Sequence, residues 1–192
     1  EGKSAKIKKI NIIGNEIFTN DELLKGFELS EGAFFSFLSN DDAYSREKLR
    51  GDIESLESFY RDRGYIKFSL ESSQISLSRD KKSIFITFNI MEGDKYNIKD
   101  VDVIGDIPFE KNLYEEITNS LKDQTYSQAQ ITAIEDYFIS VLGNQGYAFA
   151  EVSGEPEIND DSQDVKLIFS INSGARTYTR KILFTGNEIT QD

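Results

Sequence analysis

Residues 92–106 read Glu-Gly-Asp-Lys-Tyr-Asn-Ile-Lys-Asp-Val-Asp-Val-Ile-Gly-Asp, and the same plan recurs at both ends of the chain. The three copies close on Gly14, Gly105 and Gly186, each the same distance after the opening glycine of its copy. Alternating apolar residues between the two glycines predict a half-buried strand, and the closing Gly-Asn or Gly-Asp suits a turn that needs a positive φ. A plan that recurs after roughly 80 to 90 residues indicates tandem domains and is too long for a solenoid repeat.

The repeat divides the chain into two complete units and the beginning of a third. We assign residues 1–92 to the first unit, residues 93–173 to the second, and residues 174–192 to the first strand and turn of the next. The chain has 192 residues, of which 38% are hydrophobic and 29% charged, as in soluble globular proteins. Because it stops just after a third opening strand, we expect it to be part of a longer protein.

The composition excludes several kinds of chemistry. Cysteine and histidine are both absent, which removes thiolate chemistry, the commonest general base and the commonest metal ligand. The net charge of −12 divides into −2 for residues 1–92, −11 for residues 93–173 and +1 for residues 174–192. A chain this acidic repels phosphate backbones, so we expect no nucleic-acid partner.

Two helices are predicted between the first strand and the rest of the first unit. Thr19 and Glu22 fit a capping box at the start of a short helix, and residues 45–63 carry apolar side chains at helical spacing. Gly51 interrupts this second helix, which suggests close packing against a neighbour. Gly64 follows it at a position suited to a left-handed cap.

A β-hairpin is predicted to complete each unit. In the first unit residues 65–78 form a strand whose apolar phase slips at Ser72 and Ser73, which indicates a β-bulge, and residues 79–82 form the turn. Residues 84–90 then alternate cleanly as the partner strand. The second unit repeats this order, so the predicted fold class is α+β. Each unit is β-α-α-β-β, a mixed three-stranded sheet covered by two helices.

Four motifs together resemble a known family. They are Ile-Asn-Ile-Ile-Gly-Asn at residues 10–15, Phe-Tyr-Arg-Asp-Arg-Gly-Tyr at 59–65, Asp-Lys-Lys at 80–82 and Glu-Pro-Glu-Ile-Asn-Asp at 155–160. Their order and spacing resemble the POTRA domains of the BamA family of outer-membrane protein assembly factors. The resemblance covers essentially the whole chain, which is similar to the third and fourth POTRA domains and the first strand of the fifth.

This resemblance implies a scaffold that binds other proteins, and not an enzyme. It implies a periplasmic arm in a Gram-negative bacterium, attached to the outer membrane only through a barrel that follows this segment. The partners it implies are a BamB-like propeller lipoprotein, other lipoproteins of the assembly complex, and unfolded outer-membrane proteins. No cofactor is expected.

The strongest candidate site is the edge of the second strand of the first unit. An edge strand offers unpaired backbone groups to a visiting strand, and the resemblance implies that the propeller lipoprotein docks there. The candidate residues are Gln74, Ile75, Ser76, Leu77 and Ser78. In the second unit Pro156 aligns with Gln74 and three glutamates crowd the strand, which protects that edge. The alternative is that Ile75 and Leu77 fill the core or the joint between units.

A second candidate surface is the aromatic loop that contains Phe34, Phe35 and Phe37. Aromatic side chains in a long connection often mark binding, although they also tuck beneath helices.

Three other functional classes stay open on sequence grounds. The first is the POTRA arm of a related transporter, TamA-like or of two-partner secretion. The second is a calcium-binding or hydrolytic module built on acidic turns such as Asp160-Asp161, although residues 159–164 lack the glycine and final glutamate of a calcium loop. The third is an RNA-binding KH-like core, which the charge and the missing Gly-x-x-Gly clamp oppose.

Overall fold

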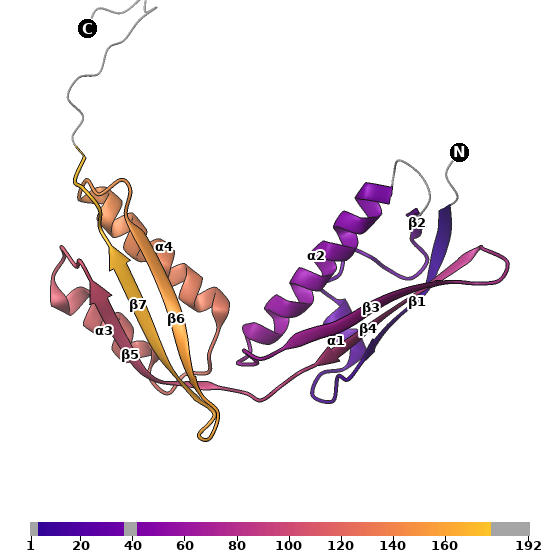
Figure 1. Ribbon diagram of the computed structural model, residues 1–192, viewed down its shortest axis with the longest axis horizontal. Coiled ribbons are helices and arrows are strands. Elements are labelled where there is room, and N and C mark those ends of the chain that lie inside the picture. The colour runs from indigo at the N-terminus through magenta and orange to yellow at the C-terminus, as the bar shows by residue number, and fades with distance from the viewer. Residues whose placement is uncertain (1–3, 37–41, 178–192) are drawn as a thin grey trace, which may run out of the picture.

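A computed structural model describes residues 4–36 and 42–177, and in it the chain forms two units, each with helices on one face of a small sheet (Figure 1). The strands are β1 (Ser4–Ile13), β2 (Phe34–Ser36), β3 (Ser69–Leu77), β4 (Ser83–Met91), β5 (Asn97–Gly105), β6 (Glu151–Asn159) and β7 (Asp164–Asn172). The helices are α1 (Asn20–Leu24), α2 (Asp42–Arg61), α3 (Lys111–Leu121) and α4 (Gln128–Asn144). The predicted third opening strand lies in residues 178–192, outside the described residues.

The predicted α+β class and the mixed sheets are confirmed. In the first unit β1 runs parallel to β4 and β3 runs antiparallel to it, and the second sheet has the corresponding order β5-β7-β6. The prediction of three strands is wrong for the first unit, whose order is β2-β1-β4-β3. The extra strand arises because Phe34, Phe35 and Ser36 pair antiparallel with the beginning of β1.

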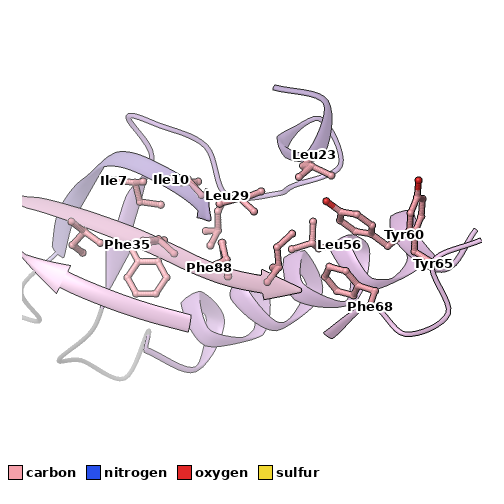
Figure 2. Close-up of a cluster of buried hydrophobic side chains, with 14 of the residues drawn as sticks. Ile7, Ile10, Leu23, Leu29, Phe35, Leu56, Tyr60, Tyr65, Phe68 and Phe88 are labelled. Carbon is pink, nitrogen blue, oxygen red and sulfur yellow. The ribbon is translucent and has the colours of Figure 1, made fainter. Parts of the chain in front are cut away.

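Each unit has its own hydrophobic core between sheet and helices. Figure 2 shows the first core, where Tyr60 of α2 stacks on Phe68 with ring centroids 4.3 Å apart. The buried strand residues of this core are Ala5, Ile7, Ile10, Ile12, Phe35, Ile84, Ile86, Phe88 and Ile90. In the second core the corresponding residues of β7 are Val165, Leu167 and Phe169, which pack on Ile131 and Phe138 of α4. The alternation of apolar residues that predicted these strands therefore identified their buried faces correctly.

The predicted helix start and glycine turns are confirmed, but the prediction about Gly51 is not. Thr19 and Glu22 form the capping box, and Gly14, Gly64 and Gly105 have φ values of +97°, +98° and +101°. Close packing at Gly51 is wrong, because a Cβ built there meets no atom within 4 Å. A side chain at this position would point into open space, so the glycine serves no packing role.

Direct contacts join the two units. The Lys67 ammonium and the Tyr96 hydroxyl both donate to Asp160 Oδ1, at 2.5 and 2.8 Å. These bonds hold the pKa of Asp160 below its ordinary value. At a second point Asp62 Oδ1 accepts from the backbone N–H of Ala129 in the first turn of α4, at 2.8 Å. The joint is thus a set of specific polar contacts rather than a free linker.

Candidate functional site

β3 lies at an edge of the first sheet. It pairs with β4 on one side and has no neighbouring strand on the other among residues 4–36 and 42–177. The pairing register shifts between Leu70 and Ser72, so Glu71 is an extra residue in the strand. This is the β-bulge that the phase slip predicted, one residue before the predicted Ser72.

The backbone phase of β3 decides which residues offer hydrogen bonds to a partner. The N–H of Ser78 donates to the carbonyl of Ser83 across the hairpin, at 2.8 Å, so the backbone of Ser78 faces β4. Backbone groups of successive residues in an antiparallel strand point to opposite sides. The N–H and C=O groups of Ile75 and Leu77 therefore point to the free edge.

The side chains of the same two residues form an accessible apolar rim. Ile75 lies opposite Ile86 and Leu77 opposite Ile84, so both lie on the helix-covered face beside fully buried neighbours. Ile75 is nevertheless 44% exposed and Leu77 36% exposed. Ile75 and Leu77 thus continue the apolar core to the edge of the sheet, where no other element covers them fully. Gln74 and Ser76 lie on the opposite, open face.

The second unit has a different edge at the corresponding strand, β6. Pro156 lies opposite Leu167, the place that corresponds to Ile75 opposite Ile86. The predicted alignment of Pro156 with Gln74 is therefore wrong by one residue. The cause is the bulge at Glu71, an insertion in β3 that has no counterpart in β6, whose register is unbroken.

The edges of β3 and β6 therefore differ at the same position of the two units. Proline has no N–H, so Pro156 removes a donor at the point where Ile75 directs one to the free edge. Glu155 and Glu157 flank it and are exposed. Acidic side chains and proline are common means of protecting an edge strand from pairing.

The pairing of β2 with β1 places the aromatic side chains of this loop in different environments. Phe35 lies opposite Ala5 in the β1–β2 ladder and is buried, so it belongs to the core and the prediction of a surface role for it is wrong. Phe34 points the other way and is 67% exposed. Phe37 lies outside the described residues.

Proline substitution gives a direct test of the backbone phase of β3. We expect Ser76→Pro to lower the free energy of unfolding of the first unit by about 1–3 kcal/mol, because the lost N–H faces β4. We expect Ile75→Pro to cost less than about 1 kcal/mol, because its N–H faces solvent. Urea unfolding followed by circular dichroism measures both, and an equal cost for the two variants would contradict the assigned phase.

One acidic residue of the turn after β6 has a structural role in the joint between the units. Asp160, proposed above as part of a cation site, is held by Lys67 and Tyr96 at the joint between units. Within residues 4–36 and 42–177 no group of three or more acidic side chains is arranged to hold a metal ion. In the same residues no helix has the length and apolar character needed to cross a bilayer.

Comparison with known proteins gives the family. The model of the POTRA family, described as a surface antigen variable number repeat, matches residues 5–93 and 96–174. The chain belongs to the POTRA family. Each match covers one unit of the fold described above, and together they cover most of the chain.

Sequence relatives of this POTRA chain are assembly factors. It is 32% identical over 193 residues to the outer membrane protein assembly factor BamA of Buchnera aphidicola, and 29% identical over 195 residues to BamA of Neisseria meningitidis. The alignments cover 100% of this chain but only 31% and 24% of those proteins. The similarity to the BamA family predicted above is confirmed.

A solved structure agrees with the fold of this POTRA pair. The crystal structure of POTRA domains 3–5 of BamA from Haemophilus influenzae matches with a TM-score of 0.82 at 22% identity. The match covers 99% of this chain and 74% of that one. At this identity the match shows a common arrangement of the two units and says nothing about individual binding residues.

Proposed function

We propose that this chain is a periplasmic scaffold segment of an outer-membrane β-barrel assembly factor, and that it works by binding and not by catalysis. The first unit docks a partner strand or loop by β-augmentation along β3. The observation that carries this proposal is the free edge at Ile75 and Leu77, where outward backbone groups and exposed apolar side chains coincide. The similarity to BamA proteins of two other bacteria supports the assembly role.

The energy available at this edge is enough for specific docking. Each backbone hydrogen bond to a visiting strand contributes about 0.5–1.5 kcal/mol net. Ile75 and Leu77 are already more than half buried, so covering them adds about 1 kcal/mol each. A partner loop that forms three or four such bonds would bind with an affinity in the micromolar range or weaker.

The proposed partners follow from the family. A BamB-like propeller lipoprotein is the proposed occupant of the β3 edge, while other lipoproteins of the complex and unfolded outer-membrane proteins contact the arm elsewhere. Unfolded barrel proteins carry strands without partners, which suits binding at an open edge. The second unit, whose β6 edge is blocked by Pro156, acts mainly as an acidic spacer on the periplasmic side of the outer membrane.

The proposal is tested by NMR titration of the labelled chain with the propeller lipoprotein. We expect amide shifts concentrated on Ser69–Leu77 of β3, and at least about a tenfold loss of affinity in the double variant Ile75→Asp/Leu77→Asp, which places two charges where burial is needed. The matched control is Ile158→Asp. Ile158 lies opposite Val165 as Leu77 lies opposite Ile84 and is 39% exposed, but its strand is the blocked edge.

Two results would contradict this assignment. Equal losses of affinity in the double variant and in Ile158→Asp would move the site away from β3. Shifts confined to the vicinity of Phe34, with β3 unaffected, would place docking on the aromatic surface instead. In either case circular dichroism of each variant separates lost docking from lost folding.

A further inference from the structure

Six exposed cations gather at the end of the first unit where β1 begins and the β3–β4 hairpin turns. They are Lys6, Lys8 and Lys9 of β1, and Arg79, Lys81 and Lys82 of the turn. The backbone N–H of Lys6 donates to the carbonyl of Lys82 at 3.0 Å, which brings the two segments together. We call these six residues the basic end, and Figure 1 shows the hairpin and the beginning of β1 on the same side of the unit, away from the second unit.

The three lysines of β1 share the open face of the sheet. Ile7 and Ile10 are buried on the helix-covered face, and the register with β4 shifts between Ile7 and Lys9, so Lys8 and Lys9 both lie on the open face with Lys6. Two aromatic rings lie beneath the ammonium groups. Lys6 Nζ is 5.2 Å from the centroid of Phe34, and Lys8 Nζ is 6.0 Å from that of Phe85.

The positive charge of the basic end is offset within its two segments only by Asp80, whose pKa the Ser78 hydroxyl and the nearby Lys82 help to lower. None of its six cations has an ion-pair partner within residues 4–36 and 42–177. The one acid in the two segments, Asp80, accepts from the Ser78 hydroxyl and from the backbone N–H of Lys82 and so organises the turn. In a chain whose net charge is −12, such a local excess of positive charge indicates an anionic partner.

We propose that the basic end binds an acidic protein segment in extended conformation, beside an apolar platform made by Phe34 and Phe85. Alternate residues of an extended chain lie on one face about 6.7 Å apart, so several acidic side chains of such a segment can face the lysines of β1. The cations lie on the open face of β1 and on the adjoining hairpin turn. A bound peptide can bend to contact both surfaces, whereas a flat bilayer contacts only one of them. The surface lies on β1 and the turn, and so is distinct from the β3 edge.

The experiment measures binding of a short fluorescein-labelled peptide that alternates glutamate and serine, by fluorescence anisotropy at low salt. The test variant is Lys6→Gln/Lys8→Gln/Lys82→Gln. The control variant is Lys25→Gln/Arg50→Gln/Lys111→Gln, which removes the same charge from exposed positions elsewhere. We expect the affinity to fall at least about tenfold in the test variant and less than about twofold in the control, and to weaken as salt is added.

A second measurement locates the bound peptide in the unaltered chain. We expect amide shifts in residues 6–9 and 79–85, and their appearance elsewhere would overturn the proposal. Equal loss in the two triple variants, or no binding of the peptide at all, would also overturn it. So would binding only to vesicles that contain phosphatidylglycerol, because that result assigns the basic end to a membrane surface.

Discussion

Replacing Gly14 or Gly105 by alanine will lower the free energy of unfolding of the affected unit by at least about 3 kcal/mol. A Cβ built on Gly14 lies 2.1 Å from the carbonyl oxygen of Ile90, and one built on Gly105 lies 2.0 Å from that of Ile171. Both contacts are with backbone at the end of a central strand, so neither can be relieved by a side chain moving away. The positive φ adds strain of its own.

The measurement is hydrogen exchange in urea, which reports the stability of each unit separately. Gly51→Ala in α2 and Gly143→Ala in α4 are matched controls, because a Cβ at either position meets nothing within 4 Å. We expect these two variants to be stabilised by about 0.5–1 kcal/mol, since alanine favours a helix more than glycine does. If Gly14→Ala proved as stable as Gly51→Ala, the close approach to Ile90 would not be a constraint.

Replacing Glu92 by alanine will lower the free energy of unfolding of the first unit by about 3–5 kcal/mol. Glu92 is nearly buried, and its carboxylate accepts from the backbone N–H groups of Glu16 and Ile17, at 2.9 and 3.1 Å, and from the Tyr60 hydroxyl at 2.6 Å. It therefore fastens the loop after β1 to the end of α2. Burial, and then the bond to Glu92, raise the pKa of Tyr60 far above its usual range, so the phenol remains a donor.

Two further variants separate the hydrogen bonds from the packing around Glu92. Tyr60→Phe removes only the hydroxyl and should cost about 1–2 kcal/mol. Combining it with Glu92→Ala should cost less than the sum of the single changes, because both remove the same bond. Strict additivity, measured by urea unfolding, would show that Tyr60 and Glu92 are not coupled.

The buried hydrogen bond between Tyr60 and Glu92 is particular to the first unit. Gly64 and Tyr65 correspond to Gly146 and Tyr147, which places Leu142 where the first unit has Tyr60. Ser173 stands where the first unit has Glu92. Leu142 is fully buried and its side chain has no polar atom, and the Ser173 hydroxyl donates instead to the carbonyl of Gly174. The second unit thus has a buried leucine where the first unit has a buried hydrogen-bonded tyrosine.

The sequence by itself determined the order of elements apart from β2, the repeat, the buried faces of the strands and the family. The elements and their buried faces depend on neighbours two to four residues apart, such as the alternation from Ile84 to Ile90 or the capping box of Thr19 and Glu22, and the repeat and the family depend on the order of such local motifs. The turns at Gly14 and Gly105 were equally readable, because a required positive φ restricts the residue type at that one position.

Only the tertiary structure decided which surfaces are available. The pairing of Phe34 to Ser36 with β1 buries Phe35 and exposes Phe34, although the two are adjacent in the sequence. The bulge at Glu71 fixes which residue of β6 corresponds to Ile75, and the hairpin brings Lys82 beside Lys6. Register and exposure depend on strands that pair across long separations in the chain, and the same alternating pattern fits more than one register until those contacts form.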